Sequence, residues 1–424
     1  MAERISRALL PDNTSVADDG MATFGGVRTD DLVTQFGTPL FVYDEDHIRK
    51  RCQEAVKAFP DGVSYASKAF LCKAIAKLVH EEGMGLDVAT IGEAYIALQS
   101  GVPASDLTLH GNNKSMEELR YAVDNGIGKV VIDSFDEIDK IEHLYATTKT
   151  PIKALVRVTP GVEAYTHKYV TTGQVDSKFG FTVQNGQAGK AIERARSSGA
   201  IDLIGLHAHI GSQIFTSDSF RKSTDILVKL AEHFGLPELC VGGGLGVPYL
   251  NDESSIPISE WGAIVHDISS SSSAALKITS EPGRSIVASS AVTIYTVGTI
   301  KEIEGVRTYV AVDGGMHDNP RPALYGSDYE TFLARSINEP REQKITLVGK
   351  HCESGDVLVK EGDIQDDLVV GDLLVTPVTG AYGHSMGSNY NKVLRPAVVF
   401  VQGGKSRLVL RREELSDLLN SDVT

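Results

Sequence analysis

Residues 63–89, VSYASKAFLCKAIAKLVHEEGMGLDVA, contain the pattern that decides the fold. An apolar run at 63–67 is followed by a segment whose apolar residues recur at 75, 78 and 79, as on one face of a helix. Gly83 is a typical helix-ending residue, and a second apolar run follows at 86–89. The stretch therefore predicts a strand, a helix and a second strand.

The same alternation continues from about residue 60 to residue 285. The predicted strands are VSYAS (63–67), LDVA (86–89), LTLH (107–110), KVVID (129–133), KALVRV (153–158), DLIGLHAHI (202–210), LCVGG (239–243) and KITSE (277–281). Most are continuous apolar runs, which is typical of parallel strands covered on both faces. Eight such strands alternating with helices predict an α/β fold with a (β/α)8 TIM-like barrel. An open, doubly wound sheet has the same alternation and stays the alternative.

After Arg284 the pattern changes to short β-branched runs broken by Gly, Pro and Asp. These runs are VTIYTVGTI, TYVAVDG, KITLVGKHC, DLLVTPV, AVVFVQGG and RLVLRR. They predict a C-terminal, predominantly β domain. Because FVYDED (41–46) is also strand-like, we expect residues 1–45 and 288–424 to form the β domain and residues 46–287 to form the barrel.

Composition narrows the class of protein. The 424 residues carry a net charge of −15, which argues against nucleic acid or an anionic membrane as the main partner. There is no apolar run of roughly 18 residues, and the first residues, MAERISRALLPDNTS, lack the apolar core of a secretory signal. Four cysteines without metal-ligand spacing predict a cytoplasmic protein with no protein-ligated metal.

Three features at predicted strand ends point to one cofactor. Lys68 closes an apolar run, where partial desolvation would favour a nucleophilic neutral amine. The glycines of GGGLG (242–246) can let backbone N–H groups approach a phosphate. EPGR (281–284) offers a carboxylate for a protonated ring nitrogen and an arginine for a substrate carboxylate. Alone, each has a simpler interpretation: a solvated lysine, a tight turn and a surface ion pair. Together they match what pyridoxal phosphate requires.

Longer motifs carry a family resemblance. They are YASKAF (65–70), LDVATIGE (86–93), LHGNNKS (109–115), GLHAHIGSQI (205–214), GGGLGVPY (242–249), EPGR (281–284), VDGGMHDNPRPALYG (312–326), CESGD (352–356) and GAYGHSMGSNYN (380–391). The chain resembles the diaminopimelate decarboxylases, pyridoxal-phosphate enzymes with an alanine-racemase-like barrel. The resemblance extends from about residue 37 onward. His317 and His384 depart from it, because smaller or different side chains are expected at these two positions.

The resemblance implies roles for individual residues. Lys68 would hold pyridoxal phosphate covalently, His209 would stack on its ring, and His207 would be a supporting residue. The implied cofactor-binding residues are Lys68, Asp87, His209, Ser212, Gly242, Gly243, Gly244, Glu281, Pro282, Gly283, Arg284 and Tyr382. The implied substrate-binding residues are Arg284, Arg321, Tyr325, Glu353 and Tyr382. Cys352 would be the proton donor, whereas Cys52, Cys72 and Cys240 are interpreted as small core residues.

The implied reaction is decarboxylation of meso-diaminopimelate to L-lysine and CO2, the last step of lysine biosynthesis. If Cys352 and Glu353 act from the neighbouring subunit, the enzyme is at least a homodimer with composite active sites. The nearest alternative is a decarboxylase of the same fold that acts on ornithine, arginine or a carboxylated polyamine. A racemase fits less well, because Glu281 favours a protonated ring. A non-catalytic pyridoxal-phosphate carrier would leave Cys352 and Tyr382 without a role.

Overall fold

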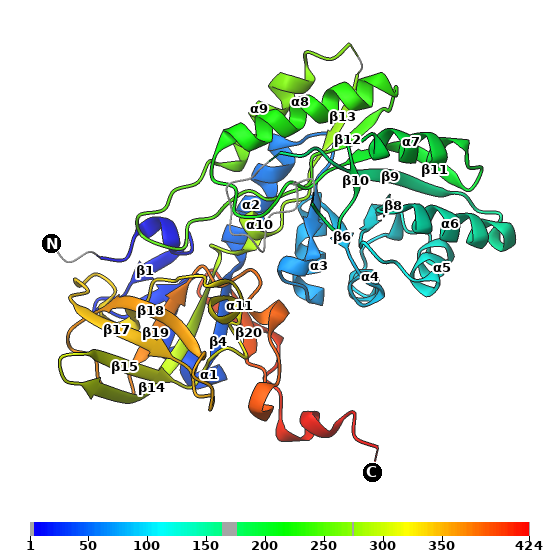
Figure 1. The fold of residues 1–424 in the computed structure, drawn as a ribbon. Helices are drawn as coiled ribbons and strands as arrows, with labels where there is room; N and C mark the ends of the chain where they lie inside the picture. The colour runs from blue at the N-terminus through cyan, green and yellow to red at the C-terminus, as the bar shows by residue number, and fades with distance from the viewer. Residues whose placement is uncertain (1–3, 163–175, 274, 424) are drawn as a thin grey trace. The chain divides into compact units, whose positions relative to one another are not determined.

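The computed structural model describes residues 4–162, 176–273 and 275–423. The chain forms two compact units (Figure 1). The barrel unit contains Arg51–Gly246 and Ser255–Ser285, and the β unit contains Met1–Lys50, Val247–Ser254 and Ile286–Thr424. These ranges differ from the predicted borders chiefly at residues 247–254, which belong to the β unit although they lie between two barrel segments.

Within the described residues, eight parallel strands follow one another around the barrel unit. They are β5 (Ser64–Ala66), β6 (Gly85–Val88), β7 (Leu107–Leu109), β8 (Lys129–Ile132), β9 (Ile152–Thr159), β11 (Ile201–His207), β12 (Glu238–Cys240) and β13 (Lys277–Thr279). A short strand, β10 (Phe181–Thr182), pairs with β9. A parallel bridge between Val63 and Ser280 joins the two ends of the sheet, and Ser64 N–H donates to the Ser280 carbonyl at 2.9 Å. The predicted barrel is therefore confirmed over the open sheet.

Helices follow the barrel strands and cover them on the outside (Figure 1). They are α2 (Glu45–Ala58), α3 (Lys73–Glu81), α4 (Ile91–Leu98), α5 (Met116–Asn125), α6 (Phe135–Thr148), α7 (Gln187–Ser197), α8 (Ser217–His233), α9 (Ile258–Ser269) and α10 (Arg284–Val287), with short turns η2 (Ser67–Ala69) and η3 (Ala104–Asp106). In α3, Ile75, Leu78 and Val79 are buried, as their spacing predicts. Gly83 follows the helix with a φ of 89°, a conformation that glycine adopts without strain. Within the described part of the chain, no helix is long and apolar enough to cross a membrane.

The β unit contains a mixed nine-stranded sheet and a separate three-stranded sheet formed by its first three strands. Its strands are β1 (Thr14–Val16), β2 (Ala22–Phe24), β3 (Val27–Arg28), β4 (Leu40–Asp44), β14 (Ala291–Ile303), β15 (Arg307–Val312), β16 (Phe332–Leu333), β17 (Gln343–Val348), β18 (Val357–Ile364), β19 (Leu373–Pro377), β20 (Ala397–Gln402) and β21 (Lys405–Leu410). Its helices and turns are α1 (Thr29–Phe36), α11 (Arg321–Tyr325), η1 (Arg7–Leu9), η4 (Ala334–Ser336), η5 (His384–Met386), η6 (Tyr390–Lys392) and η7 (Leu415–Leu419). Strand β4 pairs antiparallel with β14 and parallel with β20, so residues near the start of the chain complete a sheet formed mainly by its last third.

Candidate active site

Polar side chains gather where the barrel strands end. Asp87 lies on β6, His110 directly follows β7, His207 ends β11, and Glu281 follows β13. Lys68 lies in the turn after β5. The carboxyl ends of parallel strands meet at one face of a barrel, and this face is where barrel enzymes place their active sites. The barrel unit therefore presents a candidate site at this face.

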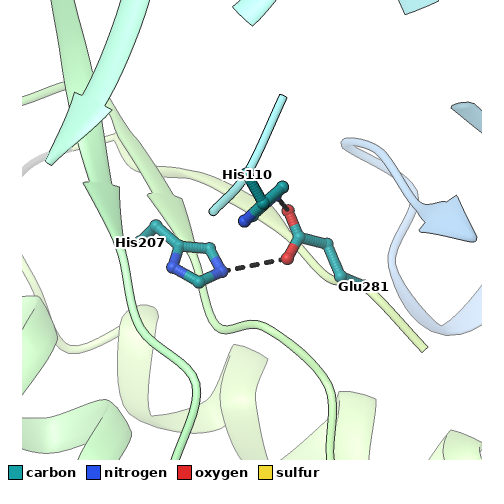
Figure 2. Close-up of side chains that lie close together, drawn as sticks. All are labelled: His110, His207 and Glu281. Atoms are coloured by element: carbon teal, nitrogen blue, oxygen red, sulfur yellow. Dashed lines mark hydrogen bonds and ion pairs between the residues drawn. The ribbon is translucent and has the colours of Figure 1, made fainter. Parts of the chain in front are cut away.

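Glu281 lies at the centre of this group and is almost fully buried. One carboxylate oxygen, Oε1, is 3.0 Å from His110 Nε2, and the other, Oε2, is 2.9 Å from His207 Nε2 (Figure 2). Asp87 Oδ1 lies 3.5 Å from the same nitrogen of His110. Two histidines from different strands thus fix the orientation of one buried carboxylate.

The histidines also set the charge of this carboxylate. Burial alone would favour its protonation, but His110 and His207 hold the pKa of Glu281 well below its usual value. Burial lowers the pKa of His207 to about 4. For His110, the carboxylates of Asp87 and Glu281 outweigh burial and raise the pKa. The site therefore presents an ionised carboxylate, as a protonated pyridine nitrogen requires.

The ligand atoms of His110, His207 and Glu281 all lie within 4.8 Å of one another, close enough to be considered as metal ligands. Their geometry also fits hydrogen bonding, because both histidine nitrogens lie at ordinary hydrogen-bond distances from the carboxylate. We interpret the group as an anion held by two N–H donors. The absence of a protein-ligated metal stays a prediction.

His209 lies near Lys68 and the glycine run. The N–H group of Gly243 donates to His209 Nδ1 at 3.3 Å, so this ring nitrogen carries no proton. Burial, with the nearby positive charges of Lys68 and Arg157, lowers the pKa of His209 well below its usual value. The ring is therefore neutral, which suits stacking on a flat aromatic cofactor.

Lys68 differs from the sequence prediction in one respect. Its neighbours Ser67 and Ala69 are buried, but Lys68 itself is exposed. The predicted partial desolvation by the surrounding protein is therefore wrong. The physical reason is that Lys68 lies in the turn η2, after β5 has ended, rather than within the strand. Its charge still acts on Asp87 and His209, which places the amine among the other site residues.

The glycine run packs directly against the backbone of neighbouring strand ends. A Cβ atom at Gly242 would lie 2.3 Å from the Ala208 carbonyl oxygen, one at Gly243 2.3 Å from that of Glu281, and one at Gly244 2.2 Å from that of Gly211. No side chain fits at any of the three positions. Packing against neighbouring backbone therefore requires these three glycines, and a glycine-rich turn at a strand end is also suited to binding a phosphate through its N–H groups.

Arg284 and Ser212 form a hydrogen-bonded pair near the glycine run. Arg284 Nη2 donates to the Ser212 hydroxyl at 3.0 Å, so a cation and a hydroxyl lie together beside Gly211. Pro282 and Gly283 follow Glu281 in the chain, and a Cβ atom at Gly283 would lie 2.9 Å from Ala66 Cβ. The site therefore combines the groups that pyridoxal phosphate requires. They are the amine of Lys68, the glycine run, the hydroxyl of Ser212 and the ionised carboxylate of Glu281.

Sequence reasoning did not assign a role to His110 or Lys114 in LHGNNKS. Lys114 is 2% exposed, and its ammonium donates to Glu137 Oε1 at 2.8 Å and to the carbonyls of Gly111 and Val131 at 2.8 and 2.6 Å. This buried, fully bonded lysine anchors the loop that follows His110. The sequence could have pointed to His110 and Lys114, because both are polar and lie at or just after the end of a predicted strand.

The other predicted residues lie in the β unit. Arg321 opens α11 and is 5% exposed. Its guanidinium carbon lies 4.3 Å from the ring centre of Tyr249, and Nη1 donates to the Tyr329 hydroxyl. Tyr382 is close enough to act on the charge of Arg321. Stacking and hydrogen bonding therefore hold Arg321 in one orientation.

The remaining candidates lie at or near the surface of the β unit. Tyr325 ends α11 and is half-buried, whereas Cys352 and Glu353 lie on an exposed loop. The other three cysteines, Cys52, Cys72 and Cys240, are buried, as the sequence predicts for core residues. His384 is also buried, with its ring edge-on to Phe41 at 5.7 Å. This packing explains one of the two histidines that depart from the resemblance.

Comparisons with known proteins also indicate a pyridoxal-dependent decarboxylase, and the similarity extends over nearly the whole chain. A family model described as the pyridoxal-binding domain of pyridoxal-dependent decarboxylases matches residues 45–288. The diaminopimelate decarboxylase of Mycobacterium tuberculosis (strain ATCC 25618 / H37Rv) is 43% identical over 434 residues, covering 97% of each chain. That of Bacillus subtilis (strain 168) is 44% identical over 420 residues, covering 95% of each.

A solved structure agrees in three dimensions. The diaminopimelate decarboxylase from M. jannaschii in complex with L-lysine has a TM-score of 0.91 and 30% identity, covering 97% of this chain and 98% of that one. The barrel and the pyridoxal-binding match make the chain a pyridoxal-dependent decarboxylase. Within that class, the chain belongs to the diaminopimelate decarboxylase family.

Proposed function

We propose that the chain uses pyridoxal phosphate to decarboxylate meso-diaminopimelate to L-lysine and CO2, and that Lys68 holds the cofactor covalently. The observation that carries the proposal is the ionised Glu281, fixed by His110 and His207 beside the glycine run. Near-full-length relatives at about 43% identity, all diaminopimelate decarboxylases, support the substrate.

When bound, pyridoxal phosphate supplies an electron sink for the pair of electrons left by CO2. The protein's own groups prepare this role. Glu281 would hold a proton on the ring nitrogen, His209 would stack on the ring, and Asp87 would help to position the end of the cofactor that Lys68 holds. The phosphate would be held by Ser212, the backbone of Gly242–Gly244 and the EPGR segment, in which Pro282 and Gly283 shape the turn. Tyr382 is the remaining residue proposed to bind the cofactor.

Further residues suit the rest of the substrate. Diaminopimelate carries two carboxylates and two ammonium groups. Arg284 and Arg321, with Tyr325 and Tyr382, can hold the carboxylate that is retained, because guanidinium groups pair well with carboxylates. Glu353 can meet the distal ammonium.

Replacing Arg321 with lysine should weaken substrate binding. The Arg321→Lys variant keeps the charge but loses the flat guanidinium that contacts Tyr249 and Tyr329. Loss of one charge-assisted hydrogen bond predicts a KM for meso-diaminopimelate raised about tenfold, with a smaller change in kcat. Steady-state kinetics measure both, and an unchanged KM would remove Arg321 from the substrate site. Arg307→Lys, at the exposed start of β15 in the same unit, is the control.

We further propose that Cys352 donates the proton that replaces CO2, and that it acts from the neighbouring subunit of a homodimer. Cys352 and Glu353 are both exposed on the single chain, as residues that complete a partner's site must be. Two-fold symmetry then gives two composite active sites.

The Cys352→Ala variant should keep the cofactor, with an unchanged absorbance spectrum, and lose about a hundredfold in kcat, the low end for general-acid catalysis because water can replace a thiol. Full activity in this variant would exclude Cys352 as the donor. Cys72→Ala, which removes a buried thiol, controls for general thiol loss.

Mixing the Cys352→Ala and Lys68→Ala proteins tests the shared site. Random reassociation should restore about a quarter of wild-type activity if the two residues come from different subunits, since half the dimers then have one intact site. Activity no greater than the sum of the two variants would mean that both residues act within one chain.

The first assay is formation of L-lysine and CO2 from meso-diaminopimelate, with and without added pyridoxal phosphate. Cofactor-dependent turnover is the expected result. A panel of ornithine, arginine and a carboxylated polyamine tests the alternative substrates. Retention of α-hydrogen exchange without CO2 release would favour a racemase.

The four free thiols support a further proposal, that the enzyme is cytoplasmic.

A further inference from the structure

His317, the second histidine that departs from the resemblance, is fully buried next to the loop that carries Cys352. Its Nδ1 atom lies 2.9 Å from Nε2 of His351, the residue before Cys352. The two rings meet edge-on, with centroids 4.9 Å apart. A buried histidine thus contacts the loop directly, although it is 35 residues away from Cys352 in sequence.

The hydrogen bonds of His317 and His351 form a chain in which His317 donates to His351 and His351 donates to Asn391. His351 Nδ1 lies 3.1 Å from the side-chain oxygen of Asn391, an acceptor, so this nitrogen carries the proton. His351 Nε2 is then the acceptor for the N–H group of His317. His317 then carries a single ring proton, on Nδ1, which agrees with burial lowering the pKa of His317 to about 4.

Backbone contacts join the same three loops. The buried carboxylate of Asp356 accepts from the N–H groups of Met316 at 2.6 Å and His351 at 2.9 Å. Ser388 N–H donates to the carbonyl of His317 at 2.9 Å. The segments that carry His317, His351 and Asn391 are therefore fastened together by side-chain and main-chain bonds.

Tyr390 connects this cluster to Glu353. Its ring lies against His351, with centroids 5.2 Å apart, and its hydroxyl lies 3.4 Å from Glu353 Oε2. Tyr390 belongs to η6, where Asn391 has a φ of 50°.

We propose that His317, His351, Tyr390 and Asn391 are positioning residues that orient Cys352 and Glu353 for the substrate. Tyr390 sets the direction of the Glu353 carboxylate, and the His317–His351–Asn391 chain fixes the base of the loop. Substrate binding is the property that this arrangement controls, because Glu353 is the group proposed to meet the distal ammonium. The inference rests on the proposed function for its kinetic effect.

The Tyr390→Phe variant keeps the ring and removes only the hydroxyl. We expect KM for meso-diaminopimelate to rise about threefold to tenfold, the effect of one hydrogen bond, with kcat within about twofold of wild type. Tyr309→Phe removes a hydroxyl from β15 in the same unit and should change neither value. An unchanged KM in Tyr390→Phe would overturn the role of Tyr390.

Asn391 allows a second test that does not depend on turnover. Asn391→Gly removes the acceptor without straining the positive φ, whereas Asn391→Asp keeps an acceptor oxygen. Cys352 is the exposed member of the four cysteines, so its alkylation by iodoacetamide reports on the loop. We expect several-fold faster alkylation in Asn391→Gly and a near-wild-type rate in Asn391→Asp.

Equal alkylation rates in wild type and Asn391→Gly would overturn the hydrogen-bonded chain. This result is distinguishable from failure of the proposed function, which would appear as absent decarboxylation in the wild-type enzyme whatever the alkylation rates.

Discussion

The Lys68→Ala variant should lose the visible absorbance of covalently held pyridoxal phosphate and about 10²–10⁴-fold in kcat. Lys68 lies among Asp87, His209 and Glu281, and its amine is the proposed covalent link to the cofactor. Removing a positioned amine that also moves protons takes away a contribution of about 10²–10⁴-fold. Absorbance spectra and steady-state kinetics on the same preparation measure both effects.

Two further lysine variants make this test specific. Lys68→Arg keeps the positive charge but cannot form the covalent link, so it should fail as Lys68→Ala does. Lys77→Ala removes an exposed lysine of α3 whose ion pair with Glu81 is long, at 3.8 Å, and it should behave as wild type. A normal spectrum in Lys68→Ala would contradict the assignment of Lys68.

The barrel was predictable because its signal is local. Each of the eight apolar runs overlaps one observed strand, and several helices between them have a local periodicity or end signal, such as Ser115, which caps α5. Closure was not predictable, because it depends on the pairing of Val63 with Ser280, more than 200 residues apart. No local pattern distinguishes a closed sheet from an open one.

The β unit was less predictable for the same reason. Its central strands were recognised, but β18 was not, because the consecutive residues 360–363, which include Gly362, interrupt its apolar pattern. The short strands β1–β3 contain two or three residues each, too few for a periodic signal. Residues 247–254 join the β unit through Tyr249, whose ring packs against Tyr329, a contact between distant residues.

Within the site, residue types were easier to predict than partners. Lys68, Glu281 and the glycine run stood out because their chemistry is unusual at strand ends. That two histidines hold Glu281, and that the ring of Tyr249 packs against Arg321, depends on side chains far apart in sequence. The exposure of Lys68 depends on a single turn after β5, a boundary that apolar patterns place only to within a few residues.

Replacing Glu281 with glutamine should lower kcat by about a thousandfold while the protein still folds and binds the cofactor. Glutamine has nearly the same shape as glutamate and can still accept from His110 or His207, but it carries no charge to hold a proton on the ring nitrogen. Removing one preorganised electrostatic contact of this kind costs about 10²–10³-fold. Measurements of kcat and of the cofactor spectrum test the prediction, and near-wild-type kcat would contradict the role of Glu281.

The lost charge also predicts a pH-dependent difference in stability. Because His110 and His207 hold the pKa of Glu281 below its ordinary value of 4.5, its ionised form stabilises the folded protein at pH values above that value. This contribution is lost as pH falls through the lowered pKa. The free energy of unfolding of wild type minus that of Glu281→Gln should therefore be largest near neutral pH and should decrease below about pH 4.5.

Glu238 provides the matched control for a buried carboxylate. It begins β12, at the opposite end of the strands from the site, is 5% exposed, and pairs with Lys129 and Lys277. Glu238→Gln should reduce stability, because it leaves a partly buried lysine without its partner, and should leave kcat close to wild type. Equal losses of kcat in the two variants would mean that Glu281 acts through the stability of the barrel rather than through its charge. A loss confined to Glu281→Gln assigns the effect to the carboxylate that the two histidines hold in place.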